Sequence, residues 1–234
     1  MKQIINLDEL QKLENDILYQ IHDFCNKHNI KYYLGYGTLL GAVRHQGFIP
    51  WDDDIDILMP RPDYEKFLQL TAKKFNDTIE IISNLSYDDY YLPFAKAIDN
   101  RTELIEEHLK DEKKIGVYID IFPIDGLPKY FINKKFHFLM MKIYIIILKI
   151  LTYKNLESKS KIKTYISKLI KPFIKFNFIT PKQIINKIEK RAMKYNYSYS
   201  EKVGVVVWGY GKKEEIDKSF FENVEKLMFN GNYY

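Results

Sequence analysis

Residues 32–59 constrain the fold of this chain more than any other stretch. They begin with a short aromatic and apolar run, bend through Gly35 and Gly37, and end in the segment PWDDDIDILM. Glycines between an apolar run and a helix-forming segment are typical of a strand, a turn and a helix. The pattern therefore predicts a strand, a glycine turn, a helix and a second strand over Asp54–Met59.

Three aspartates of this segment are spaced two residues apart. Side chains alternate between the faces of a strand, so Asp52, Asp54 and Asp56 are expected on one face, with Ile55 and Ile57 in the core. Carboxylates two residues apart lie roughly 7 Å from each other and repel by roughly 2 kcal/mol at an effective dielectric constant of about 20. A divalent cation would reverse that cost, and Mg²⁺ prefers oxygen ligands. An acidic turn before an edge strand, or an Asp-rich helix start, is the alternative.

The glycine turn suits phosphate binding. Gly37 and Thr38 precede the predicted helix, where backbone N–H groups approach an anion closely, and Thr38 is a candidate helix cap. The spacing of Gly35, Gly37 and Gly41 is not the dinucleotide fingerprint, and no Lys-Ser or Lys-Thr pair follows to make a Walker loop. A glycine turn, a helix and then Asp-x-Asp on a strand are a more specific combination than the glycines alone.

The order of these motifs resembles that of the nucleotidyltransferase superfamily. Their amino-acid sequences resemble those of the LicD family, which includes fukutin and fukutin-related protein. The resemblance is dense in the N-terminal half and thin beyond it. The matching residues are Gly37-Thr38-Leu39-Leu40-Gly41, Arg44, Gly47, Pro50-Trp51-Asp52-Asp53-Asp54-Ile55-Asp56, Arg61, Tyr64, Ile119-Asp120-Ile121-Phe122-Pro123 and Asp125-Gly126.

The resemblance implies an α+β fold of the polymerase-beta type, with a mixed sheet flanked by helices. We expect residues 1–128 to form the nucleotidyltransferase-like catalytic core. Residues 129–234 are expected to form a mainly helical, lysine-rich extension packed on that core. The family continues into a further tyrosine-glycine-aspartate segment, so we expect the extension to be incomplete at its C-terminus, with a short family member as the alternative.

Asp120 is the candidate third carboxylate. It lies between Tyr118 and Phe122 on one face of a predicted strand over Ile115–Phe122, where an unpaired acid is costly. Nucleotidyltransferase-like folds bring such a carboxylate from a neighbouring strand, as a metal ligand or as a base. Asp125 is interpreted as a turn former. The predicted catalytic residues are Asp54, Asp56 and Asp120, and the predicted ligands of Mg²⁺ or Mn²⁺ are Asp52, Asp54, Asp56 and Asp120.

Four basic residues are candidate nucleotide or phosphate contacts, together with Gly37 and Thr38. Arginine occurs only four times, so Arg44 and Arg101 are candidates for bidentate phosphate binding, with surface salt bridges as the alternative. His45 adjoins Arg44, although a loop histidine is often only solvated. Lys96 lies on a strand predicted to pair with residues 102–106 around a turn at 99–100. A cross-strand salt bridge is the alternative for Lys96.

The N-terminus and the single cysteine indicate the compartment. Residues 6–29 read as an amphipathic helix with an Asn6–Glu9 capping box, without the apolar core of a signal peptide. Cys25 lies on its apolar face and is expected in the core, not as a nucleophile. One cysteine excludes an intrachain disulfide. We expect a cytoplasmic protein, with the inner face of the membrane as a further location.

Residues 129–180 differ in character from the rest of the chain. They contain twelve lysines and one acidic residue, Glu157, around a strongly apolar run at 136–153. Lys142 and Lys149 interrupt that run and argue against a membrane span. The segment is either a helical subdomain with solvated lysines or a basic amphipathic surface for anionic lipid. No nucleic-acid recognition module is visible, so no nucleic-acid partner is expected.

The resemblance implies transfer of a substituted phosphate from a CDP-alcohol donor to a hydroxyl of a cell-surface glycan or its lipid-linked precursor. Phosphocholine from CDP-choline is the leading case. Transfer of ribitol phosphate or glycerol phosphate stays open, as does nucleotidylation of a protein or small molecule. A non-catalytic membrane-surface module is the alternative from another class.

Overall fold

The computed structural model describes residues 5–87, 89–106, 109–110, 113–154 and 179–234. The lysines between 155 and 178, with their predicted helices, lie outside the described residues. The α-helices of the described part are α1 (Leu7–His28), α2 (Tyr36–His45), α3 (Arg61–Thr71), α4 (Phe131–Thr152) and α6 (Pro181–Ala192). Short 3₁₀ helices are η1 (Tyr197–Tyr199), η2 (Gly211–Glu214) and η3 (Lys218–Phe221).

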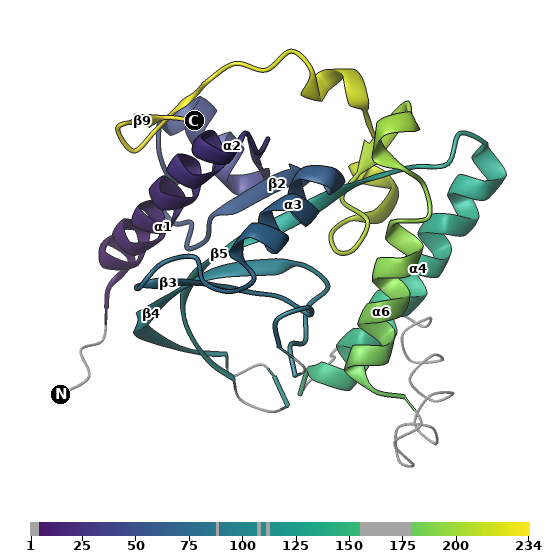
Figure 1. The fold of residues 1–234 in the computed structure, drawn as a ribbon, viewed down its shortest axis with the longest axis horizontal. Helices are drawn as coiled ribbons and strands as arrows, with labels where there is room; N and C mark the ends of the chain where they lie inside the picture. The colour runs from purple at the N-terminus through teal and green to yellow at the C-terminus, as the bar shows by residue number, and fades with distance from the viewer. Residues whose placement is uncertain (1–4, 88, 107–108, 111–112, 155–178) are drawn as a thin grey trace.

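A mixed sheet forms the centre of the molecule (Figure 1). Its main path runs β1-β2-β5-β4-β3, with β6 pairing with β5 and β7 pairing with β6. Among the strand pairs of this sheet in the described residues, only the β2–β5 pair is parallel. The strands of this sheet are β1 (Tyr33–Leu34), β2 (Asp56–Pro60), β3 (Ile79–Ile82), β4 (Ala95–Glu106), β5 (Lys113–Gly126), β6 (Lys202–Gly204) and β7 (Ile216–Asp217). Strands β8 (Met228–Phe229) and β9 (Asn232–Tyr233) form a separate hairpin. The predicted α+β class with helices on a mixed sheet is confirmed.

Helix α1 begins and packs as its sequence predicts. The Asn6 side chain accepts from the Glu9 backbone N–H, and the Glu9 side chain accepts in return from the Asn6 backbone, which completes the capping box. Its apolar side, including Ile17, Ile21 and Cys25, is buried against the sheet. Cys25 is therefore a core residue, as predicted.

Two apolar clusters cover the two faces of the sheet. One joins α1 and α3 to the inward side chains of β2, β4 and β5, such as Ile57, Ala97 and Ile119. The other joins β5 to α4, α6 and the buried run Val205–Val207. In Figure 1, α4 and α6 lie side by side at one end of the molecule. Among the described residues, every helix is too short or too polar to cross a bilayer.

Two local predictions are wrong. Residues 95–106 form one strand with an irregularity between Asp99 and Leu104, and not a hairpin, because both halves pair with the long strand β5. Asp125 is not in a turn: it lies in β5, fully buried, with both carboxylate oxygens accepting from Arg61 at 2.7 and 2.8 Å. Arg61 also contacts Glu189 of α6 at 3.0 Å, so this buried network ties α6 to the sheet.

The C-terminal half contacts the sheet at several points. Strand β6 continues the sheet at the end of β5, where Asp125 is the register partner of Gly204. The Tyr33 hydroxyl donates to the Phe221 carbonyl at 2.7 Å. Beyond η3 the chain returns across the molecule, and the β8–β9 hairpin lies beside α1 and α2 (Figure 1). The division at residue 128 stays a prediction.

Candidate active site

Asp56 and Asp120 lie on adjacent strands at the centre of the site. They are register partners in the parallel β2–β5 pair. Neighbouring strands are about 4.8 Å apart, and registered residues point to the same face, so the two carboxylates face the same space. The Asp120 backbone N–H also donates to the Ile55 carbonyl at 2.9 Å. The predicted meeting of two carboxylates from neighbouring strands is confirmed.

The first turn of α2 holds Asp56 by its backbone. The Gly35 N–H donates to the Asp56 carbonyl at 2.9 Å, and the Asp56 N–H donates to Thr38 Oγ1 at 2.8 Å. The prediction that Thr38 caps this helix is wrong. Gly35 is the N-cap residue, and Thr38 lies inside the first turn. Its hydroxyl instead accepts the hydrogen bond from the Asp56 N–H at the start of β2. This contact explains why a glycine-threonine turn accompanies an aspartate at the start of a strand.

The segment Asp52–Asp54 is a loop, which we call the acidic loop. Strand β2 begins only at Asp56, so the predicted alternation of Asp52 and Asp54 along a strand is wrong. The loop nevertheless brings one carboxylate oxygen from each of Asp52, Asp53 and Asp54 within 4.8 Å of one another. Gly37 is adjacent: a Cβ there would lie 2.6 Å from Asp52 Oδ2, so any side chain would displace that carboxylate.

The carboxylates of the site repel one another. Burial, then Asp120 and Asp54, raise the pKa of Asp56 to about 8. Burial, then Asp52, Asp120 and Asp53, raise the pKa of Asp54 to about 6. Burial also raises the pKa of Asp120, which Lys96 opposes. These mutual effects place the acidic loop, Asp56 and Asp120 in one electrostatic cluster, in which Lys96 opposes the raised pKa values of Asp54, Asp56 and Asp120.

Among the described residues, Lys96 forms an ion pair with this cluster. It is the register partner of Asp120 across β4 and β5, and its Nζ lies 2.7 Å from Asp120 Oδ1. The same Nζ lies 3.2 Å from the centre of the Tyr118 ring, a cation–π contact. Lys96 is buried, and burial lowers its pKa against the opposing effect of Asp120. The salt bridge considered as the alternative is present, and it lies inside the site.

The other predicted basic residues lie farther away. Arg44 and His45 are exposed in the last turn of α2, about 10 Å along the helix from Gly37 at 1.5 Å per residue. Arg44 has no hydrogen bond or ion pair to any described residue. Arg101 lies five residues beyond Lys96 on β4, about 16 Å at strand spacing, and donates to Asp99 at 2.7 and 2.9 Å. That position argues against the predicted nucleotide contact of Arg101.

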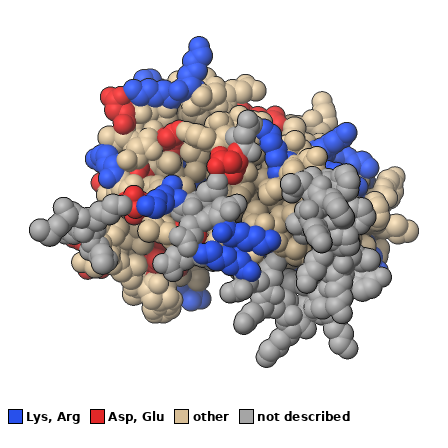
Figure 2. Space-filling model, turned by 90° about the horizontal axis from the view of Figure 1, so that it is seen from below, with Lys and Arg blue, Asp and Glu red and all other residues tan. Residues whose placement is uncertain are grey.

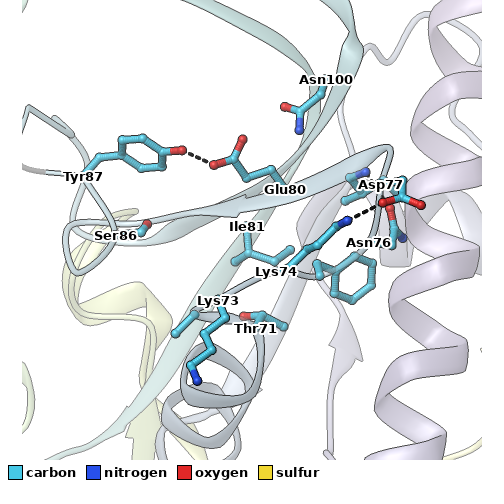
Figure 3. Close-up of a pocket in the computed structure, with 13 residues that line it drawn as sticks. Thr71, Lys73, Lys74, Asn76, Asp77, Glu80, Ile81, Ser86, Tyr87 and Asn100 are labelled. Carbon is cyan, nitrogen blue, oxygen red and sulfur yellow. Dashed lines mark hydrogen bonds and ion pairs between the residues drawn. The ribbon is translucent and has the colours of Figure 1, made fainter.

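A separate cavity of about 460 Å³ lies at the other edge of the sheet (Figure 3). It opens between the end of α3, strand β3 and the loop at 83–87. A Lys74–Asp77 ion pair and a Tyr87–Glu80 hydrogen bond cross its walls. Because β4 separates β3 from β5, this cavity is remote from Asp120 and holds none of the predicted site residues.

Known proteins share this arrangement of motifs. A family model described as LicD/FKTN/FKRP, nucleotidyltransferase domain, matches residues 29–147. The lipopolysaccharide cholinephosphotransferase LicD of Haemophilus influenzae is 31% identical over 240 residues, which cover 98% of this chain and 85% of that protein. The chain belongs to the LicD family.

Two rickettsial relatives of this LicD-family chain match over shorter segments. An uncharacterized protein of Rickettsia prowazekii is 36% identical over 138 residues, which cover 54% of this chain and 48% of that protein. One of Rickettsia typhi is 53% identical over 57 residues, which cover 23% of this chain and 18% of that protein. Family membership and the near full-length relationship to a named cholinephosphotransferase identify the chain as a phosphotransferase.

Two residues at this LicD-family site were not predicted. Tyr36, at the start of α2, has a positive φ of 42°, and its hydroxyl donates to Glu214 Oε2 at 3.2 Å. The contact brings the C-terminal half to the glycine turn, and only the tertiary structure reveals it. Glu14 of α1 is buried near the acidic loop. A sequence signal for Glu14 existed, because it interrupts the apolar stripe of the helix between Leu10 and Ile17.

Proposed function

We propose that this enzyme transfers phosphocholine from CDP-choline, with Mg²⁺ or Mn²⁺, to a hydroxyl of a cell-surface glycan or its lipid-linked precursor. The main support is the pairing of Asp56 with Asp120 beside the acidic loop, in a chain related along nearly its whole length to a lipopolysaccharide cholinephosphotransferase. In this reaction the acceptor oxygen attacks the phosphorus that bears choline. The P–O bond to CMP breaks, and the acceptor hydroxyl loses its proton.

The residues of the site fit a divalent cation. Carboxylate oxygens are the ligands that Mg²⁺ prefers, and the set offered is Asp52, Asp54, Asp56 and Asp120. Burial first, and then the neighbouring carboxylates, raise the pKa values of Asp54 and Asp56, and a bound cation would favour their charged forms. When bound, Mg²⁺ would supply charge neutralisation at the diphosphate of the donor.

The protein groups have distinct proposed roles. Gly37 and the N-terminus of α2 lie beside Asp52 and offer backbone N–H groups to a phosphate. Asp120 either completes the cation site or accepts the proton of the attacking hydroxyl. Lys96, which is paired with Asp120, is proposed to offset charge on the transferred group. Arg44, exposed at the far end of α2, is proposed to reach the diphosphate from outside.

We also propose that the first turns of α4 contact anionic lipid at the inner face of the membrane, where a lipid-linked acceptor resides. Ile132 and Leu139 are 78% and 52% exposed, and their helical spacing places them on one face with Lys135 and Lys142. Exposed apolar residues flanked by lysines suit an interfacial helix. On the face drawn in Figure 2, the basic side chains of the described residues form small separate groups.

The enzymatic proposal is tested by product release. Purified protein is incubated with Mg²⁺, an acceptor glycan and, in separate reactions, CDP-choline, CDP-ribitol, CDP-glycerol or a nucleoside triphosphate. We expect CMP release to be fastest with CDP-choline. A preference for another CDP-alcohol would replace the donor, and release of pyrophosphate from the triphosphate would indicate nucleotidylation.

Variants connect this activity to the site. Asp54→Asn and Asp56→Asn are expected to lower turnover at least a hundredfold, whereas the control Asp23→Asn, an exposed carboxylate on α1, keeps it. Retention of most turnover by Asp56→Asn would refute the proposed mechanism. Binding to vesicles of anionic and zwitterionic lipid tests the α4 surface, with Ile132→Ser/Leu139→Ser as the variant and the exposed Leu85→Ser as its control.

A further inference from the structure

Glu14 is a buried carboxylic acid on the core side of α1. Only 3% of the residue is exposed, and it lies in the same stripe as the buried Ile17 and Leu18. Its Oε2 atom is buried without a hydrogen-bond partner in the described part of the chain. A buried polar oxygen without a partner costs free energy of folding. The position therefore needs a physical explanation beyond packing.

The surroundings of Glu14 supply that explanation. One helical turn earlier, Gln11 Nε2 donates to the backbone carbonyl of Asp52 at 2.9 Å. Residues three apart face the same side of a helix, so Glu14 also faces the acidic loop. After burial, the carboxylates of Asp54, Asp53, Asp120 and Asp52 raise the pKa of Glu14 to about 9. The contact of Gln11 with Asp52 and the shared helix face therefore place the buried Glu14 side chain on the side of α1 that faces the acidic loop.

We propose that Glu14 is a further ligand of the divalent cation held by the acidic loop. It approaches that loop from α1, whereas Asp56 and Asp120 approach it from β2 and β5. The inference rests on the proposed function, and it adds a ligand from an element outside the glycine turn and the two strands. Its unpartnered oxygen would then bind the same cation as the clustered oxygens of Asp52, Asp53 and Asp54.

Cation binding by the full chain tests this inference without an activity assay. Mn²⁺ is titrated calorimetrically into wild type, Glu14→Gln, Asp56→Asn and the control Asp23→Asn, which removes an exposed carboxylate from the same helix. We expect Glu14→Gln to raise the Kd for Mn²⁺ at least fivefold and Asp23→Asn to leave it within twofold. Melting in EDTA should show Glu14→Gln at least as stable as wild type, because glutamine keeps the shape without the carboxyl.

A Kd for Glu14→Gln less than fivefold above wild type overturns the inference. If Asp56→Asn weakens Mn²⁺ binding while Glu14→Gln does not, the inference fails and the proposed cation site stands. If neither variant weakens binding, the cation role of both residues fails. Should Glu14→Gln not fold, Glu14→Asp withdraws the carboxylate by one methylene, and an unchanged Kd for that variant overturns the inference equally.

Discussion

Lys96 and Asp120 form an ion pair between register partners on two central strands, with Lys96 Nζ 2.7 Å from Asp120 Oδ1. Asp120 is at the same time the register partner of Asp56 on its other side. The Asp120 carboxylate therefore lies between the ammonium group of Lys96 and Asp56, the acid with which it is proposed to bind Mg²⁺. The charge of Lys96 compensates Asp120 when no cation is present, and it opposes the entry of one.

Replacing Lys96 by methionine is expected to separate these two effects. Asp120 loses its partner, which lowers the stability of the cation-free protein by about 1–3 kcal/mol. Mn²⁺ binds more tightly because a positive charge beside its ligand is gone. Melting in EDTA and calorimetric titration measure the two changes. Lys74→Met, which removes the exposed partner of Asp77, should change neither quantity. Weaker Mn²⁺ binding by Lys96→Met would contradict the prediction.

The stability of the cation-free protein should fall as pH rises. Burial, then Asp120 and Asp54, raise the pKa of Asp56 to about 8 in the folded protein. In the unfolded chain the pKa of an aspartate is about 3.9. Between these values the folded state binds more protons, so the stabilisation present at low pH is lost as pH rises through 8. We expect Tm in EDTA to fall by about 5 °C or more between mildly acidic and alkaline buffer.

Two controls accompany this pH series. Asp56→Asn should flatten the decline, because asparagine does not titrate, and Mn²⁺ should restore wild-type stability at alkaline pH by binding the folded state. Asp23→Asn should keep the wild-type slope. An Asp56→Asn variant with an unchanged slope would show that the dependence arises elsewhere.

Thr38→Val is expected to loosen the start of β2. Valine has the size of threonine but cannot accept the Asp56 N–H bond, which is 2.8 Å long in the structure. Leaving this donor unpaired should cost about 1–3 kcal/mol and lower turnover, because Asp56 loses a constraint. Thr38→Ser keeps the acceptor and should stay close to wild type in both Tm and CMP release. Equal losses in the valine and serine variants would point to packing instead.

The two exposed arginines should differ in their effect on kinetics. Arg101 is paired with Asp99 far along β4, so Arg101→Gln should leave kcat/KM within twofold. Arg44→Gln should lower kcat/KM about tenfold or more if Arg44 contacts the diphosphate, since charge-assisted hydrogen bonds to phosphate are strong. Steady-state CMP release gives kcat/KM for both variants. A greater loss of kcat/KM in Arg101→Gln than in Arg44→Gln would indicate that Arg101, and not Arg44, contacts the diphosphate.

Local patterns predicted the elements whose determinants lie close together in sequence. The capping box placed the start of α1, and alternating isoleucines placed the core side of β5. Thr38 and Asp125 were misjudged because their partners, the Asp56 N–H and Arg61, lie far away along the chain. The strand over 95–106 was read as a hairpin since its pairing with β5 cannot be inferred from local propensity.

The sequence by itself determined that a glycine turn, a helix and an aspartate-rich segment follow one another, and that Asp120 occupies a costly strand position. Those features depend on the chemistry of neighbouring residues. Only the tertiary structure decided that Asp120 meets Asp56 and Lys96, that Asp52 and Asp54 belong to a loop, and that Glu14 joins them from α1. Strand register and helix packing set such distances, and both arise from burying the whole core at once.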